Sequence, residues 1–205
     1  MKLIILDPED QDDILAERVE TGADRFDEVW DGVHVVSPLP NDEHQEIVAN
    51  FVISIGTVIQ LPKLGKVRPG VNVSDRVEGW EQNFRGPDVV VYLNGTGARN
   101  YGAHWVGGPD FAIEVICRHN RSREKFDFYA KVGTRELLIV DRYPWALELY
   151  RLGEAGYFEL VGRSMVERPD VLASRVLPLS LRLVEGEKRP RIAIDHADGD
   201  RSWLA

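Results

Sequence analysis

The sequence predicts a single domain of the α/β (α+β) class, in which a central mixed β-sheet is flanked by helices. Its 205 residues suit one domain, and a hydrophobic content of 43% is enough to form a buried core. Strand patterns precede and follow helical patterns along the chain, as in sheets that helices cover. Two nearly continuous apolar runs, at 89–92 and 111–117, are typical of strands buried on both faces.

The N-terminal part of the chain predicts a helix followed by a hairpin. An acidic, weakly amphipathic stretch at 9–20 predicts the helix, so residues 1–24 are expected to form an N-terminal helical extension. Strand-like runs at 26–29 and 33–36 flank Asp31-Gly32, a dipeptide that is typical of tight hairpins.

Two further helices are predicted from apolar spacing and capping residues. Between Asp42 and Leu61, after the N-cap residue Asn41, apolar residues recur at helical spacing. Ser122 caps a shorter helix that runs to Val132.

The remaining segments predict strands, a long loop and a tail. Besides the two apolar runs, strand patterns begin at Gly65 and occur at 136–140, 145–150 and 157–161. Segment 94–108 holds five glycines without periodicity, which predicts a loop. The last twenty residues, 186–205, are charged and weakly periodic, so we expect a C-terminal tail after a folded domain at 25–185.

The charge and cysteine content exclude several classes of protein. There are 25 Lys and Arg against 34 Asp and Glu, and the net charge of −9 opposes nonspecific binding to nucleic acids or anionic membranes while allowing a local basic groove. The only cysteine, Cys117, excludes an intrachain disulfide and a cysteine-based zinc site. No apolar segment has the length of a signal peptide or a membrane span, so we expect a cytoplasmic protein with no membrane partner.

Two acidic residues in apolar surroundings are the main candidates for a functional site. Glu114 interrupts the run 111–117, where an ionised carboxylate without a partner is costly. Asp88 precedes the run 89–92, and if the two strands are neighbours, both carboxylates can converge and bind Mg²⁺ through oxygen. A structural ion pair or a solvent-facing carboxylate is the alternative for Glu114, and a turn or cap is the alternative for Asp88.

A lysine and a histidine lie on the apolar faces of the helices. Lys125 falls in the apolar arc of the 122–132 helix, where it can extend to solvent, meet Glu114 or stabilise charge on a phosphate. His44 shares the apolar stripe of the 42–61 helix, and a packing role there is the alternative to a functional one. We expect both side chains to point into the cleft of the two acids. If Lys125 is an unpaired cation, Lys125→Met will lose activity but little stability.

These residues belong to an ordered set of short motifs. The motifs are Trp30-Asp31-Gly32, Ser37-Pro38 with His44, Pro87-Asp88-Val89-Val90-Val91, Glu114-Val115-Ile116, Lys125 with Phe128-Tyr129-Ala130-Lys131-Val132-Gly133, and Glu136-Leu137-Leu138-Ile139-Val140-Asp141. In this order, over about residues 25–160, the set resembles the Uma family of putative restriction endonucleases, which belongs to the PD-(D/E)XK nuclease superfamily.

The resemblance implies a restriction-endonuclease-like core in which Asp88 and Glu114 match the metal-binding acids of the superfamily. Two positions depart from the pattern. The usual lysine falls two residues after the glutamate, where this chain has Ile116; in the Uma family a lysine on the following helix is a substitute, and Lys125 matches it. Arg121 stands where the family segment carries an aspartate, which implies a change in metal affinity or substrate geometry.

The resemblance also implies a mechanism. Asp88 and Glu114 hold one Mg²⁺ or Mn²⁺ that activates a water, Lys125 positions that water or stabilises the phosphorane, and His44 orients the water or a phosphate oxygen. The expected protein is a metal-dependent endonuclease that hydrolyses DNA as a homodimer. A basic cradle for the DNA would draw on Lys63, Lys66, Arg68, Arg85, Arg118 and Arg121.

Two other functions are compatible with the same residues. One is a catalytically silent nuclease-fold module with a binding or regulatory role, which Ile116 at the lysine position would permit. The other is a metal-dependent hydrolase that acts on a different phosphodiester.

Overall fold

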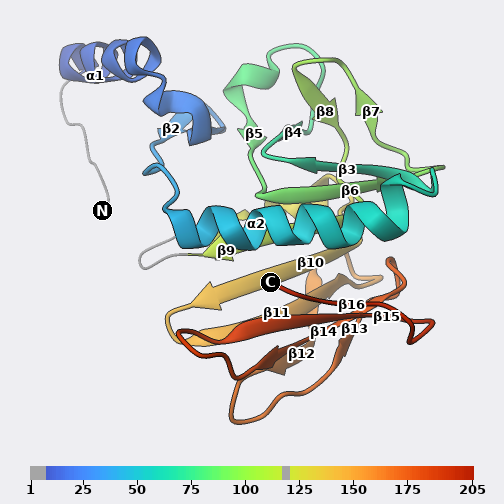
Figure 1. The fold of residues 1–205 in the computed structure, drawn as a ribbon. Coiled ribbons are helices and arrows are strands. Elements are labelled where there is room, and N and C mark those ends of the chain that lie inside the picture. Colours follow the sequence, from blue (N-terminus) through green and yellow to red (C-terminus); the bar gives the residue numbers. More distant parts are fainter. Residues whose placement is uncertain (1–7, 117–120) are drawn as a thin grey trace.

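A six-stranded mixed sheet forms the centre of the molecule in the computed structural model, which describes residues 8–116 and 121–205 (Figure 1). Its strands follow the order β12 (Phe158–Ser164), β11 (Trp145–Leu152), β10 (Glu136–Arg142), β9 (Phe111–Ile116), β6 (Val89–Leu93) and β3 (Gly65–Pro69). Strands β9 and β10 are parallel, and the other neighbours are antiparallel. The predicted α+β class with a mixed sheet is confirmed.

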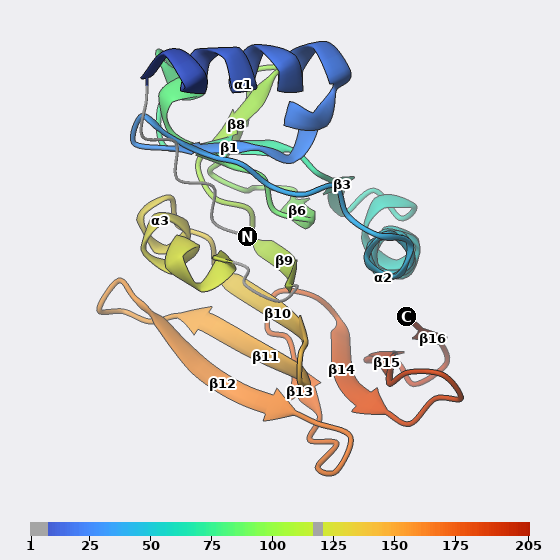
Figure 2. The same ribbon diagram turned by 90° about the vertical axis from the view of Figure 1, so that its left-hand side faces the viewer.

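The two faces of the central sheet are covered by different helices (Figure 2). Helix α2 (Asp42–Ile55) lies on one face and α3 (Phe126–Lys131) on the other. Because strand side chains alternate, Val89 and Val91 join the core under α2, while Val90 joins the core under α3. The same alternation directs Glu114 towards α3, since its neighbours two residues away, Ala112 and Ile116, belong to the α3 core.

Both predicted helices differ in detail from regular α-helices. A π-helical turn at Gly56–Gln60 continues α2 almost to the predicted end of the helix. A 3₁₀ turn at Ser122–Lys125 precedes α3, so the predicted 122–132 helix is α-helical only in its second half.

A second six-stranded sheet, a four-stranded sheet and an N-terminal helix complete the described fold. The N-terminal sheet consists, in spatial order, of β2 (Val33–Val35), β1 (Glu28–Trp30), β5 (Phe84–Arg85), β4 (Asn72–Ser74), β8 (His104–Val106) and β7 (Arg99–Asn100). The C-terminal sheet consists of β13 (Leu172–Ala173), β14 (Leu179–Val184), β15 (Arg191–His196) and β16 (Ser202–Leu204). The remaining helical elements are α1 (Pro8–Thr21) and 3₁₀ turns at Ala23–Phe26 and Trp80–Gln82.

The predicted hairpin is the β1–β2 pair. Asp31 and Gly32 at its turn have φ values of 48° and 84°, the left-handed conformation that a tight hairpin turn requires. Segment 94–108, in contrast, is not only a loop, because β7 and β8 lie within it.

The prediction that residues 186–205 form a tail is wrong. Strands β15 and β16 belong to the C-terminal sheet, and Ile192, Ile194 and Ala205 are fully buried in the core that contains α2. The backbones of Ile192 and Ala205 exchange two hydrogen bonds of 2.9 Å. The apolar signal of this segment is only three residues long and has charged neighbours, too short a pattern to predict a strand.

Helix α1 is tied to the chain segments that follow it. The Arg18 guanidinium donates to both carboxylate oxygens of Asp27, at 2.6 and 2.7 Å, and to the carbonyl oxygen of Ser37 at 3.0 Å. The expected N-terminal extension is therefore helical at 8–21 and anchored. In the part of the chain that the structure describes, no helix is both long enough and apolar enough to cross a membrane.

Candidate active site

A cleft of about 440 Å³ lies where the central sheet meets the β1–β2 hairpin and the start of α2. Its lining includes the four residues that the sequence analysis singled out: Asp88, Glu114, Lys125 and His44. They come from α2, β9, the 3₁₀ turn before α3 and the segment that leads into β6, so the fold brings them together.

Asp88 is positioned by strand pairing. Val89 at the start of β6 is paired with Ile113 of the antiparallel strand β9, so Asp88 lies beside Glu114 in the same register. Asp88 Oδ2 accepts a hydrogen bond of 2.7 Å from the backbone N–H of Val115, and Oδ1 lies 2.9 Å from His44 Nε2. The sheet and helix α2 thus fix the orientation of this carboxylate.

Glu114 is a buried carboxylate with protein donors on both oxygens. Its Oε1 accepts from Lys125 Nζ at 2.9 Å and from the Tyr129 hydroxyl at 2.5 Å. Its Oε2 accepts from Lys125 Nζ at 3.0 Å and from Ser122 Oγ at 2.7 Å. Burial raises the pKa of Glu114, as do the nearby Asp88 and Glu28, while the charge of Lys125 opposes this effect. Lys125 is therefore the main group that favours the ionised form.

Lys125 lies between two carboxylates. The residue is 7% exposed, and Nζ is 2.7 Å from Glu28 Oε1 in addition to its contacts with Glu114. Burial by itself would lower the pKa of Lys125, but the charges of Glu114 and Glu28 outweigh it and raise the pKa above the ordinary value. The assumption that this cation is unpaired is therefore wrong, because the 3₁₀ turn directs it towards β9 and β1.

His44 lies in the first turn of α2. Asn41 caps the helix by accepting the His44 N–H at 3.1 Å, which places the imidazole over the end of the central sheet. The side chain is largely buried, and its Nε2 faces Asp88. His44 and Lys125 thus enter the same cleft and contact different acids.

Three residues that were not predicted as site residues from the sequence complete the cluster. Ser122 and Tyr129 donate to Glu114, and Glu28 accepts from Lys125. The spacing of four residues between Lys125 and Tyr129 is a signal that both share one helical face. No comparable signal exists for Glu28, which is 97 residues from Lys125 in the chain.

The predicted basic cradle is largely absent from the cleft. Of its described members only Arg121 is part of the lining, which also includes Arg25, Lys125 and Arg142. Lys63, Lys66 and Arg68 lie outside this lining, and the buried Arg85 stacks on Phe128 at 4.2 Å. Arg118, like Cys117, lies outside the described residues.

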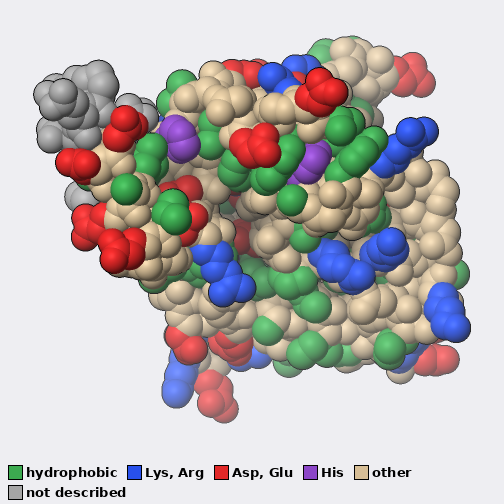
Figure 3. Space-filling model, turned by 90° about the horizontal axis from the view of Figure 1, so that it is seen from above, with side chains coloured by type: hydrophobic (Ala, Val, Ile, Leu, Met, Phe, Trp, Pro, Cys, Tyr) green, Lys and Arg blue, Asp and Glu red, His purple; other side chains and the backbone are tan. Residues whose placement is uncertain are grey.

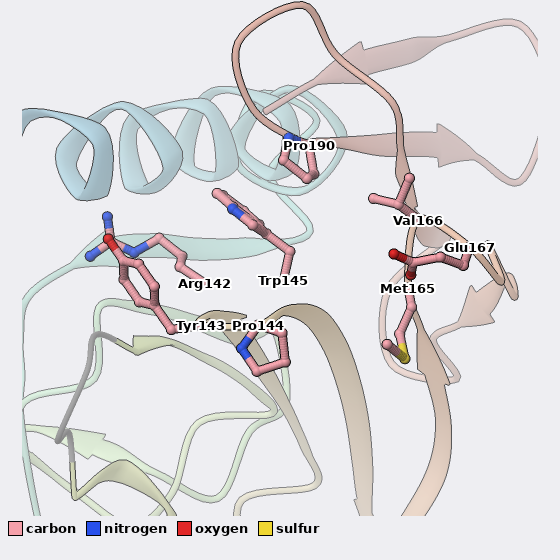
Figure 4. A pocket seen from close by; sticks show the side chains of 8 residues that line it. All are labelled: Arg142, Tyr143, Pro144, Trp145, Met165, Val166, Glu167 and Pro190. Atoms are coloured by element: carbon pink, nitrogen blue, oxygen red, sulfur yellow. The ribbon is translucent and has the colours of Figure 1, made fainter.

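A second pocket, of about 530 Å³, lies at the turn between β10 and β11 (Figure 4). Arg142 and Tyr143 line both this pocket and the cleft. The pocket has one acidic residue in its lining, Glu167, and therefore does not offer a pair of carboxylates. For this reason the cleft, and not this second pocket, is the candidate active site.

The donor atoms of the cleft fit one Mg²⁺ or Mn²⁺. Asp88 and Glu114 supply carboxylate oxygens, which these hard cations prefer. Each Asp88 oxygen contacts one protein group, His44 Nε2 or the Val115 N–H, and keeps a further lone pair. At Glu114 a metal ion would replace a hydrogen bond, because Lys125, Tyr129 and Ser122 already contact both oxygens.

The protein provides few metal ligands at the cleft. In residues 8–116 and 121–205, no group of three or more His, Cys, Asp or Glu side chains has an arrangement suited to a metal. Two carboxylates leave most of the coordination positions to water, phosphate oxygens and a backbone carbonyl, as is usual for Mg²⁺.

Comparisons with known proteins place this chain among nuclease-like folds. A crystal structure of a putative nuclease belonging to DUF820 from Anabaena variabilis is similar to it, with a TM-score of 0.55 and 18% sequence identity over 72% of this chain and 80% of that one. No curated protein matches the chain. The model of the Uma2 family, described as "Putative restriction endonuclease", matches residues 15–184. With most of its length matched, including the residues of the cleft, the chain belongs to the Uma2 family.

Proposed function

We propose that this protein is a metal-dependent endodeoxyribonuclease, which hydrolyses phosphodiester bonds of DNA with Mg²⁺ or Mn²⁺. The observation that carries the proposal is the meeting of Asp88 and Glu114 with the buried ammonium group of Lys125 at one cleft. Two carboxylates and a cation form a set that can hold a metal ion and still stabilise a phosphate. Membership in the Uma2 family supports the same reaction class.

The contacts suggest a role for each side chain. Asp88 and Glu114 would hold the metal ion, which, when bound, neutralises phosphate charge and lowers the pKa of a water nucleophile. Lys125, kept protonated by its two carboxylate partners, donates to a phosphate oxygen and offsets the charge that develops in the transition state. His44 holds Asp88 in place through Nε2 and helps to orient the water or a phosphate oxygen.

The charge distribution suggests how DNA would bind. Figure 3 shows acidic side chains gathered at the α1 end of one face, and lysine and arginine side chains in separate groups rather than in one continuous surface. The cleft itself has Arg25 and Arg121 in its lining. Affinity for DNA would therefore come from few phosphate contacts and fall less steeply with salt than in a strongly basic nuclease.

We further propose that the protein is a homodimer, in which two clefts act on the two strands of a duplex. Light scattering after gel filtration tests this oligomeric state.

A plasmid-cleavage assay tests the proposed activity. Supercoiled DNA is incubated with the protein in Mg²⁺, in Mn²⁺ and in EDTA, beside the variants Asp88→Ala and Asp170→Ala. We expect metal-dependent nicking and linearisation by the wild type, and a loss of about 10²–10³-fold for Asp88→Ala, the size typical of removing one preorganised electrostatic group. Asp170 is a matched control, because it is about half exposed, pairs with Arg168 and lies outside the lining of the cleft.

Two results would contradict the proposal. Equal cleavage by wild type and Asp88→Ala would show that the activity comes from a contaminant or from another site. A wild type that binds Mn²⁺ but cuts neither single-stranded nor double-stranded DNA would favour the catalytically silent binding module instead.

A further inference from the structure

Glu28 is a third acid at the cleft, and like Glu114 it is buried, with only 4% of the residue exposed. It belongs to β1, in the hairpin that forms one wall of the cleft. Its Oε1 accepts from the backbone N–H of Gly86 at 2.8 Å and from Lys125 Nζ at 2.7 Å. Its Oε2 accepts from Trp30 Nε1 at 2.6 Å. With donors on both oxygens, this carboxylate has one fixed orientation.

The contacts of Glu28 join two parts of the site that come from different elements. Gly86 lies two residues before Asp88, in the segment between β5 and β6. Lys125 is the last residue of the 3₁₀ turn that precedes α3. A single oxygen atom of Glu28 thus binds both the backbone segment that leads to Asp88 and the ammonium group of Lys125.

Lys125 shares its ammonium group between Glu28 and Glu114, at similar distances of 2.7 and 2.9 Å. Glu114 is also a ligand of the metal ion in the function proposed above. A divalent ion on Glu114 would occupy its lone pairs and repel the ammonium group. The hold of Glu28 on Lys125 would persist, because Trp30 and Gly86, and not Glu114, fix the Glu28 carboxylate.

We infer that Glu28 is a positioning residue that keeps Lys125 directed into the cleft when Glu114 binds the metal ion. This inference rests on the proposed function. Glu28 acts through Lys125 and not on the substrate itself. Without the charge of Glu28, Glu114 would be the only carboxylate paired with the lysine, and Lys125 and the metal ion would then compete for the same two oxygens.

Three variants separate this role from a purely structural one. Glu28→Gln removes the charge with little change in shape. Glu28→Asp keeps the charge but draws the carboxylate back by one methylene, away from Lys125. Glu78→Gln makes the same chemical change as the first variant at an exposed residue outside the lining of the cleft. Circular dichroism and thermal melting establish that each variant is folded.

Two measurements are made on the folded variants. Calorimetric titration gives the Kd for Mn²⁺ alone, and single-turnover cleavage at saturating DNA and Mn²⁺ gives the rate. For Glu28→Gln we expect a Kd about 10-fold higher and a rate about 10–100-fold lower, as is typical when a partner of an active-site ligand is removed. The KM for DNA, from cleavage rates over a range of DNA concentrations, should stay unchanged, because Glu28 does not contact the substrate. Glu28→Asp should give intermediate values, and Glu78→Gln should match the wild type.

The results distinguish this inference from the proposed function. A folded Glu28→Gln with the Kd and rate of the wild type would overturn the role of Glu28 and leave the nuclease assignment intact. A wild type without cleavage would overturn the nuclease assignment itself and, with it, the role of Glu28. If Glu28→Gln does not fold, Glu28→Asp tests the inference instead. A Kd for Mn²⁺ and a cleavage rate equal to those of the wild type would contradict the inference for that variant as well.

Discussion

At the residue scale, the buried charges around Lys125 set the energetics of the site. Burial of an isolated ammonium group is costly, and the charges of Glu114 and Glu28 offset this cost. The arrangement depends on all partners, because removal of one member of a buried ion pair leaves the other charge uncompensated. Here the loss of Lys125 would leave two buried carboxylates without their shared cation.

We therefore expect Lys125→Met to lose both activity and stability. Methionine retains the apolar stem but not the charge, so metal-dependent cleavage should fall below detection. The free energy of unfolding should decrease by about 3–5 kcal/mol, the usual effect of breaking a buried ion pair. Urea denaturation measures this loss, with Lys188→Met, at an exposed lysine, as the control. A free energy of unfolding equal to that of the wild type would contradict this prediction, since it would mean that the two acids become protonated at no cost.

At the element scale, Asp75 connects the N-terminal sheet to α3. It follows the last residue of β4 and accepts from Arg76 at 2.7 Å, from Asn83 at 3.2 Å and from Lys131, at the end of α3, at 2.6 Å. The hydrogen bond from Arg76 is the main cause of a lowered Asp75 pKa; burial opposes it, and Lys131 lowers the pKa further. Asp75 thus helps to hold the helix whose preceding turn carries Lys125.

The lowered pKa predicts a stability difference that depends on pH. Because the native state binds the proton of Asp75 more weakly than the unfolded chain does, the ionised carboxylate stabilises the fold above about pH 4, and this contribution disappears as the pH falls further. Asp75→Asn should thus be less stable than the wild type at pH 7, by at most about 1 kcal/mol, since Arg76 and Lys131 are substantially exposed to solvent. Thermal melting between pH 7 and pH 2 checks this, and a difference that does not narrow in acid would contradict it.

At the scale of the whole molecule, the C-terminal sheet completes the core under α2. Ile192, Ile194 and Leu183 are fully buried there, in one cluster with Phe51 of α2. Arg189 also pairs with Glu46 of α2 at 2.7 Å. The segment from 186 onwards therefore covers apolar surface that would otherwise face water.

Deletion of residues 187–205 should prevent stable folding. It would remove β15 and β16 and expose part of the buried face of α2, whereas deletion of a true tail would have no such effect. A milder change, Ile194→Ala, should cost about 2–5 kcal/mol in urea denaturation, the range for a buried isoleucine. The control is Val161→Ala, because this valine is 42% exposed on β12. A truncated protein that melts cooperatively at the wild-type temperature would show that the C-terminal strands are dispensable.

The features that depend on local patterns could be predicted from the amino-acid sequence. The apolar runs of β6 and β9 and the helical spacing of α2 are signals within one strand or a few helical turns, and they predict the central sheet and the long helix. Asp88 and Glu114 stood out for the same reason, since each interrupts or borders an apolar strand. The prediction that the two carboxylates lie close together required only one further assumption, that their strands are neighbours in the sheet.

Which charged side chains contact one another depends on the packing of the whole chain and could not be predicted from the sequence. Glu28 lies 97 residues from Lys125, and no periodic pattern relates two side chains whose contact depends on how a hairpin, a strand and a 3₁₀ turn pack together. Strand β15 could not be predicted either, because its apolar pattern is short and the strand forms by pairing with β14. Local periodicity arises from the backbone geometry of one element, whereas the partners of a buried charge are set by the free energy of packing the whole chain.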